Sequence, residues 1–110
     1  MWIYENKDFI EEQIQDNYGF VYLITNLTNG RKYIGKKFFY SSKTRQVKGK
    51  KKRYKAPSDW QTYYGSSAEL AKDVLSLGNE NFTREILHLC QSKGECGYLE
   101  AKEQIGRAHV

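Results

Sequence analysis

Two tyrosines eleven residues apart form the pattern in this 110-residue chain that is most suited to chemistry. Tyr22 and Tyr33 lie on either side of Asn29-Gly30, a pair that favours a tight hairpin turn. Both are therefore expected in the paired region of one antiparallel hairpin, where their hydroxyls converge if they share a face. Gly35 follows Tyr33 by two, and a glycine inside a strand indicates a bulge or the close approach of another group.

A block of cations begins directly after this pattern. Phenols beside cations such as Lys36 and Lys37 are expected to have a lowered pKa, which suits a general base. From residue 36 to residue 55 there are ten basic residues and no acidic one. These are Lys36, Lys37, Lys43, Arg45, Lys48, Lys50, Lys51, Lys52, Arg53 and Lys55. Such a block predicts a polyanionic partner, nucleic acid first, and a solvated loop without a partner is the alternative.

Periodicity and turn residues predict the elements that must position these groups. In order they are a short helix over 7–15, strands over 19–26 and 31–38, a long loop over 39–59, a helix over 67–77, a strand over 82–90 and a helix over 94–104. A helical alternative exists for 82–90. The order predicts an α+β domain with a small three-stranded antiparallel sheet flanked by helices.

The length suits one small domain, assigned to residues 18–104 after an N-terminal extension over 1–17. Residues 105–110 match a translated sequencing adapter, so we expect a non-native tail and a missing natural C-terminus. The alternative is that these residues are native.

The two cysteines, Cys90 and Cys96, are too few for a disulfide framework and do not form a CxxC pair. Cys90 ends an apolar run and is expected in the core. The sequence shows no signal peptide and no transmembrane run, so a reducing, cytoplasmic setting without a membrane partner is expected.

The hairpin resembles a known nuclease signature. Gly19-Phe20-Val21-Tyr22 and Tyr33-Ile34-Gly35 are similar to the two halves of the GIY-YIG motif, with Phe-Val in place of Gly-Ile. The spacing of the tyrosines and the later order of helix, strand and glutamate-bearing helix are similar as well. The resemblance covers residues 18–104.

This resemblance implies a metal-dependent DNA endonuclease of the phage or homing kind. By position, Tyr22 would help to activate the attacking water with Tyr33 assisting, and a helix glutamate would bind Mg²⁺ or Mn²⁺. Glu100 is the first candidate for the metal ligand and Glu103 the second. A solvated helix acid is the alternative for each.

The family also uses an arginine after the second motif to contact the scissile phosphate. Arg45 is the nearest candidate and Arg53 the next. Some relatives use a lysine just after the glycine instead, which would correspond to Lys36 or Lys37 in this chain. Plain phosphate contacts are the alternative. The residues expected to bind DNA are Lys36, Lys37, Lys50, Lys51, Lys52 and Arg53. An asparagine that follows the family's catalytic helix has no counterpart here.

Two other functions stay open. One is a non-catalytic nucleic-acid-binding module that uses the basic loop 36–55, and the other is a small RNA- or ribosome-associated protein, given the net charge of +5. A missing C-terminal segment or DNA-targeting domain would supply specificity. Trp60, Tyr63 and Tyr64 are expected to pack on the sheet rather than stack on bases, and His88 is expected to face solvent.

Overall fold

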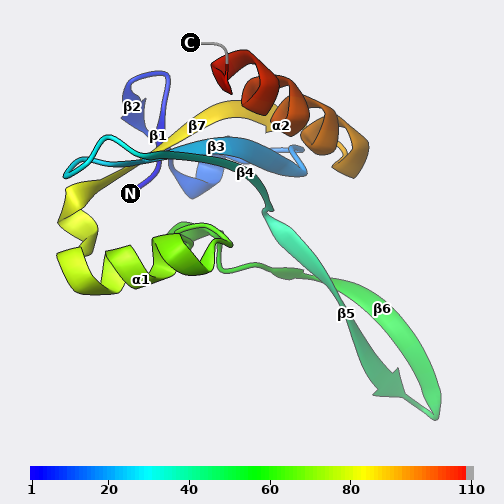
Figure 1. Ribbon diagram of the computed structural model, residues 1–110. Coiled ribbons are helices and arrows are strands. Elements are labelled where there is room, and N and C mark those ends of the chain that lie inside the picture. The colour runs from blue at the N-terminus through cyan, green and yellow to red at the C-terminus, as the bar shows by residue number, and fades with distance from the viewer. Residues whose placement is uncertain (109–110) are drawn as a thin grey trace.

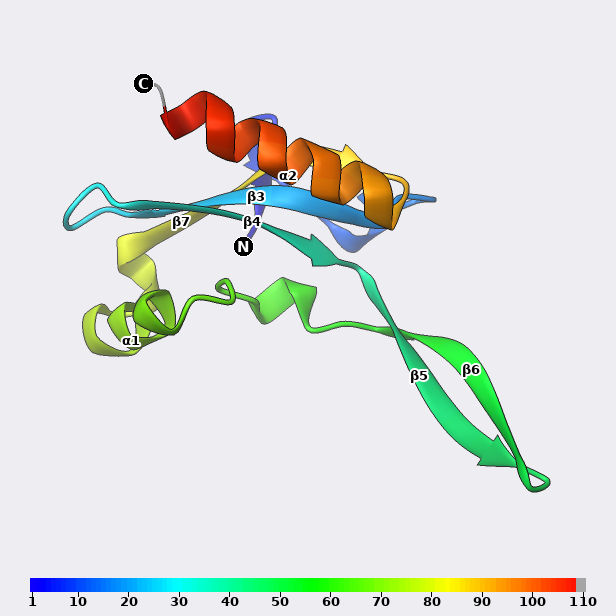
Figure 2. The same cartoon turned by 45° about the vertical axis from the view of Figure 1, so that its right-hand side comes forward.

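A mixed five-stranded sheet lies between two helices in a computed structural model, which describes residues 1–108 (Figure 1). The strand order is β2-β1-β7-β3-β4, with α2 over one face and α1 below the other in both views (Figures 1 and 2). The strands are β1 (Ile3–Tyr4), β2 (Lys7–Asp8), β3 (Gly19–Asn26), β4 (Lys32–Phe38), β5 (Tyr40–Val47), β6 (Lys50–Pro57) and β7 (Phe82–Cys90). The helices are α1 (Ala68–Leu77) and α2 (Lys93–Ala108), with 3₁₀ turns at Glu11–Gln13, Trp60–Thr62 and Asn79–Asn81. Residues 109 and 110, the end of the expected tail, lie outside the described part.

The hairpin β3-β4 forms where its turn residues predict it. Asn26 is fully buried, and its Oδ1 accepts hydrogen bonds from the Thr28 amide at 3.0 Å and from Thr28 Oγ1 at 2.7 Å. The amide of Arg31 donates to Asn29 Oδ1 at 2.9 Å. Gly30 has a φ of 75°, a left-handed conformation that favours glycine. These local bonds fix the turn and with it the register of the two strands.

That register decides which side chains share a face. Tyr22 pairs with Gly35, and Ile24 pairs with Tyr33. Because cross-strand partners point to the same side, both phenols and Gly35 lie on the face that carries α1. The core on this face comprises Trp2, Phe9, Ile14, Phe20, Tyr22, Ile24, Phe39, Trp60, Leu70, Phe82 and Ile86.

The N-terminal segment differs from its prediction. The helix expected over 7–15 is wrong, since β1 and β2 form a small antiparallel hairpin and β1 also runs parallel to β7. Glu5 and Asn6 make the turn with positive φ, and the Phe9 amide donates to the Trp2 carbonyl at 2.8 Å. Trp2 and Phe9 are each 1% exposed. Burial of these two aromatic rings and pairing with β7 outweigh the weak helical periodicity.

The stretch 39–59 also differs, because most of it is a two-stranded antiparallel hairpin rather than a loop. Strands β5 and β6 project away from the sheet (Figures 1 and 2), and we call residues 40–57 the basic arm. Lys48 and Gly49 form its tip with φ values of 51° and 77°. The loop prediction is wrong because neither face of the arm covers a core, so no apolar alternation marks the strands.

The remaining predicted elements are confirmed. Helix α1 begins after Ser67, whose Oγ accepts a hydrogen bond from the Leu70 amide at 3.4 Å, and ends at Gly78. Strand β7 covers all of the run predicted over 82–90, so the helical alternative is not adopted. Helix α2 contains the helix predicted over 94–104 and extends to Ala108.

A disulfide joins Cys90, at the end of β7, to Cys96 in α2, and both cysteines are fully buried. The core position predicted for Cys90 is confirmed. The bond itself lies outside what the sequence predicts, because two cysteines at this spacing form no framework pattern.

The α+β class is therefore confirmed, but the expected three-stranded antiparallel sheet is too small. Two further strands come from the N-terminal segment, and the parallel contact of β1 with β7 makes the sheet mixed. Within residues 1–108, neither helix has the length and apolar character needed to cross a membrane.

Trp2→Ala tests whether the N-terminal strands belong to the folded unit. Trp2 contacts Phe20 and Tyr22, and its indole nitrogen donates to the Trp60 carbonyl at 2.7 Å. Its truncation should lower the free energy of unfolding by about 3–5 kcal/mol in urea denaturation. The half-exposed neighbour Ile10, changed to Ala, should cost much less. A detachable extension would instead give equally small losses for both, and Trp2→Phe keeps the comparison measurable if the alanine variant fails to fold.

Candidate active site

The side chain of Tyr22 crosses the sheet over Gly35. The two residues pair directly across β3 and β4, and a side-chain carbon at Gly35 would collide with the Tyr22 hydroxyl. On the other side, a side-chain carbon at Gly65 would lie 3.5 Å from the same hydroxyl. Two glycines thus leave the space that the phenol occupies, and Gly35 lets it reach the outer edge of β4. The expectation of close approach at Gly35 is confirmed.

A cleft of about 460 Å³ opens at this edge, between the start of α1 and the end of α2. Tyr22 and Tyr33 both line it, with Ser66 and Ser67 on one wall and Gln104 on the other. The Tyr33 hydroxyl is buried and finds no hydrogen-bond partner among residues 1–108. A buried hydroxyl without a partner is costly, so a ligand or water bound in the cleft would satisfy it.

Helix α2 approaches the same edge from the opposite face of the sheet. Its Gln104 side chain donates to the carbonyl of Ile34 at 3.2 Å. One turn earlier, a Glu100 carboxylate oxygen lies 3.9 Å from the Lys36 ammonium, and Lys36 also passes close to Gly97. Glu100 and Gln104 lie on one helix face at i, i+4 spacing. Glu100 therefore stands beside the cleft, next to a cation of β4.

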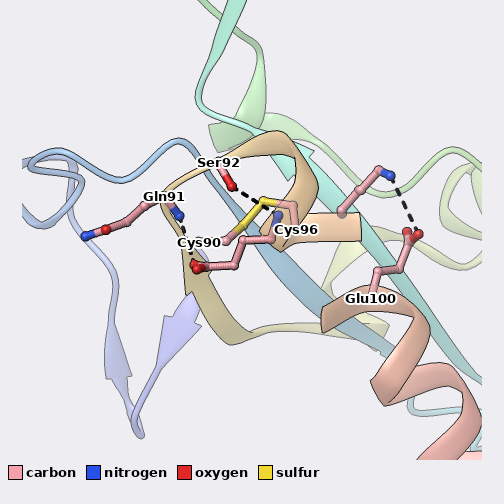
Figure 3. The surroundings of a disulfide bond; sticks show 7 residues. Cys90, Gln91, Ser92, Cys96 and Glu100 are labelled. Carbon is pink, nitrogen blue, oxygen red and sulfur yellow. Dashed lines mark hydrogen bonds and ion pairs between the residues drawn. A yellow bond between two sulfur atoms is a disulfide. The ribbon is translucent and has the colours of Figure 1, made fainter. Parts of the chain in front are cut away.

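The disulfide fixes where this helix face begins. Figure 3 shows Cys96 bonded to Cys90, with Glu100 one turn further along the same helix. The Ser92 side chain accepts from the Glu95 amide at 3.1 Å, and the Glu95 carboxylate accepts from the Gln91 amide at 3.0 Å. This reciprocal cap and the covalent bond hold the first turn of α2 on β7.

Glu103, the second candidate for the metal ligand, is engaged elsewhere. Its carboxylate lies 2.7 Å from His88 Nε2 and 3.1 Å from Arg107 Nε. The hydrogen bond with His88, supported by the charge of Arg107, holds the pKa of Glu103 below its usual value. His88 is thus a partner of α2 rather than the solvent-facing residue expected from its sequence.

The basic candidates are spread over three places. Lys36 faces α2, whereas Lys37 on the other face lies 2.6 Å from Asp59 and 4.2 Å from the centre of the Tyr63 ring. The hydrogen bond from Lys37 lowers the pKa of Asp59. The structure does not bring Arg45 to the cleft. It lies on β5 over the Tyr54 ring, five residues beyond the base of the arm, a distance of about 17 Å along the strand.

The other DNA-binding candidates, Lys50, Lys51, Lys52 and Arg53, all lie on β6 of the arm. Arg53 pairs with Thr44 near the middle of the arm, so it too stands away from the cleft. The packing expected for Trp60, Tyr63 and Tyr64 is confirmed, since Trp60 is buried in the core and the two tyrosines pack against it.

The electrostatics of Tyr22 contradict one expectation. Burial raises the pKa of its phenol well above the usual value, and the neighbouring Tyr63 and Glu100 raise it further, against a smaller opposing effect of a hydrogen bond with Ser66. The expected lowering by Lys36 and Lys37 is wrong, because each lysine is turned toward an acid, Glu100 and Asp59. Tyr22 is a neutral phenol at physiological pH.

The side chains around the cleft fit an open metal site rather than a closed one. Within the described chain, no three His, Cys, Asp or Glu side chains are grouped closely enough to hold an ion. Glu100 offers a single carboxylate with a side chain that is 24% exposed. One carboxylate completed by waters and substrate oxygens is a ligand set that Mg²⁺ accepts.

The sequence did not predict the walls of the cleft, which Ser66, Ser67 and Gln104 form. The signal in the sequence is Gly65, because a glycine directly before the two serines that precede a helix indicates a turn or a close approach. In the structure Gly65 has a φ of 91°.

The raised pKa of Tyr22 predicts an alkaline instability. The folded state favours the neutral phenol, so its contribution to stability is complete below pH 10 and is lost as the pH rises further, through the folded pKa. Denaturation midpoints measured from pH 8 to pH 11.5 should therefore fall less steeply above pH 10 for Tyr22→Phe than for the wild type. The exposed Tyr98→Phe serves as the control and should keep the wild-type slope. Equal slopes for all three proteins would contradict a raised pKa at Tyr22.

Comparison with known proteins identifies the family. The family model described as "Putative endonuclease segE, GIY-YIG domain" matches residues 2–109, nearly the whole chain. Searches of curated proteins and of solved structures found no match. The matched model, together with the paired tyrosine hairpin and the glutamate-bearing helix at its edge, shows that the chain belongs to the GIY-YIG endonuclease-domain family.

Proposed function

We propose that this protein is a metal-dependent DNA endonuclease that hydrolyses phosphodiester bonds at the edge of β4. The observation that carries the proposal is the approach of Tyr22 and Glu100 to one strand edge from opposite faces of the sheet. Tyr22 reaches the edge over Gly35, and the charge of Glu100 acts on its phenol. The family match supports nuclease chemistry, and the basic arm supports a polyanionic substrate.

A substrate phosphate would approach the outer side of β4, which is the open edge of the sheet. Strand β4 ends the sheet, so its outer side has no neighbouring strand within residues 1–108. Lys36 is the cation of β4 nearest to Glu100 and would contact a phosphate oxygen there. We therefore favour Lys36 over Arg45 for the scissile phosphate, because Arg45 stands out on the arm.

The hydrolysis divides the work among these groups. Water attacks phosphorus, one phosphorus–oxygen ester bond breaks, and the leaving sugar oxygen takes up a proton. The neutral Tyr22 phenol accepts a hydrogen bond from the attacking water. As the new phosphorus–oxygen bond forms, the phenol oxygen takes a proton from that water and gives its own hydroxyl proton to a phosphate oxygen, while the leaving sugar oxygen takes its proton from a solvent water. The Tyr33 hydroxyl, which has no protein partner among residues 1–108, supplies a second hydrogen bond in the cleft.

Glu100 would hold the divalent ion, Mg²⁺ or Mn²⁺. When bound, the ion would supply positive charge for the phosphoryl and leaving oxygens. The carboxylate is suited to this because its ion pair with Lys36 is long and partly exposed, unlike the two short contacts of Glu103. Binding at Glu100 would also release Lys36 toward the substrate.

Substitution of Tyr22 and Glu100 tests the proposal directly. Tyr22→Phe should slow Mg²⁺-dependent nicking of supercoiled plasmid by about 10²–10⁴-fold, the usual contribution of a proton-transfer group. Glu100→Gln should abolish Mg²⁺-dependent nicking, because the ion loses its carboxylate ligand. Both variants should still shift DNA in gels, since the arm is untouched.

Glu103→Gln is the matched control for Glu100→Gln. The substitution removes the same charge three residues away, at a carboxylate that contacts His88 and Arg107 instead of Lys36. It should lower stability while keeping cleavage. Equal cleavage by wild type and Glu100→Gln would reject Glu100 as the metal ligand.

Gly35→Ala tests the path of the Tyr22 phenol. The added methyl group would collide with the Tyr22 hydroxyl, so the phenol must leave the edge of β4. Nicking should fall about as far as in Tyr22→Phe, whereas DNA binding and the α+β circular dichroism spectrum persist. Gly94→Ala, which meets no neighbouring atom within 4 Å, should leave nicking unchanged. Full activity of Gly35→Ala would contradict this placement of Tyr22.

The basic arm favours one other function, a nucleic-acid-binding module without catalysis. That reading predicts gel shifts that weaken steeply with salt, together with no nicking in Mg²⁺ or Mn²⁺.

A further inference from the structure

The basic arm carries cations on both faces, which is unusual for a surface that lies flat on a polyanion. Residues 40–57 include eight basic residues and no acidic one. The register places Lys43, Arg45, Lys50 and Lys52 on one face, which we call the Arg45 face. Lys51, Arg53 and Lys55 lie on the other, the Arg53 face, and Lys48 stands at the tip. All eight side chains are exposed.

A ribbon that rests on one row of phosphates needs cations on one face only. Cations on both faces suit a ribbon with phosphates on both sides, as between the two walls of a groove. The major groove of B-DNA, about 12 Å wide, admits a two-stranded ribbon, whereas the narrow major groove of duplex RNA does not. The shape and charge of the arm therefore favour double-stranded DNA.

The arm also carries hydrogen-bonding groups suited to base edges. On the Arg53 face, Ser42, Thr44 and Gln46 form one row along β5, beside the cations of β6. Thr44 and Gln46 are exposed. Glutamine pairs with adenine through two hydrogen bonds in the major groove, and threonine contacts several bases. These uncharged groups add little to affinity for phosphate. Their place beside the cations therefore points to recognition of the base sequence.

The base of the arm holds it in a defined direction from the cleft. The chain enters through Phe39, which is 1% exposed and stacks on Phe9, and leaves through Ser58. The Ser58 amide donates to the Phe39 carbonyl at 2.9 Å, and its hydroxyl donates to the Phe38 carbonyl at 2.6 Å. Thr44 and Gln46 lie nine and eleven residues after Gly35, so at most about 32 Å and about 40 Å separate them from it. Spans of this size are about one turn of DNA, or roughly ten base pairs.

We propose that the basic arm enters the major groove of double-stranded DNA and that Thr44 and Gln46 read base edges within about ten base pairs of the cut. The proposal rests on the proposed nuclease function for its substrate. The arm would supply the sequence preference of this domain, with its Arg53 face turned toward the base edges and the long cationic side chains of both faces reaching phosphates of the two walls.

Binding selection from a random duplex library tests the reading groups. Tyr22→Phe serves as the parent, so that DNA is bound but not cut. Adding Thr44→Ala and Gln46→Ala should weaken the selected base preference by about tenfold to a hundredfold at one or two positions, without changing the dependence of binding on salt. An unchanged preference would overturn the proposal.

The cations are tested by the salt series. Lys51→Gln with Arg53→Gln in the same parent should reduce the slope of log K against log salt by about 2, while Lys72→Gln on α1 should leave it unchanged. Methylation of guanine N7, which blocks the major groove, should interfere with binding within ten base pairs of the wild-type cut. No interference, or equally tight binding to duplex RNA, would overturn the proposal.

These outcomes separate the two proposals. Arm-dependent interference without any nicking would reject the nuclease function and leave the groove contact standing. Nicking that depends on Tyr22 but has the same base preference in the Thr44 and Gln46 variant would reject the arm proposal alone.

Discussion

The contact between Tyr22 and Gly35 is the constraint on which the site depends. A tyrosine in the middle of a central strand would ordinarily end its side chain inside the core, over the neighbouring strand. Here the neighbouring position has no side chain, so the ring is buried while its hydroxyl reaches the edge of the sheet. Burial raises the pKa of the phenol, and the strand register places Tyr22 directly opposite Gly35. Chemistry and packing are therefore set by the same pair.

The second half of the site, Glu100, is positioned by helix α2 rather than by the hairpin. Helix α2 is held on the opposite face by the Cys90–Cys96 bond, by His88 on Glu103 and by Gln104 on the edge carbonyl of Ile34. Glu100 stands between these anchors. The cleft thus lies where two layers meet at a free strand edge, and the sheet itself separates the phenols from the carboxylate. Such a site is an open strand edge rather than an enclosed pocket, which suits the extended phosphodiester backbone of the proposed substrate.

Much of the site could be predicted because its signals are local. Asn29-Gly30 fixes the hairpin, the hairpin fixes the relation of Tyr22 to Tyr33, and Ser67 and Gly78 bound α1. The direction of the pKa shift at Tyr22 could not be predicted, since it depends first on the burial of the phenol by tertiary packing and then on the neighbouring Tyr63 and Glu100. The N-terminal strands could not be predicted, because strands of two residues are too short to show an alternation of polar and apolar side chains. They are stabilised instead by the burial of Trp2 and Phe9 in the core. The strands of the arm could not be predicted, because both of their faces meet solvent and no alternation of polar and apolar residues marks them.

The anchoring of the arm by Phe39 and Ser58 has a consequence for which mutations this chain can tolerate. Strands β5 and β6 pair with each other and with no other strand of the described chain, so the arm can change in length or composition without disturbing the sheet. An isolated hairpin of this kind is marginally stable, and it is attached to the sheet only at its base, near Phe39 and Ser58. Mutations that alter its polar row therefore cost the folded body little free energy. The residues of the proposed recognition row can therefore change without altering the cleft, which Tyr22 and Gly35 fix.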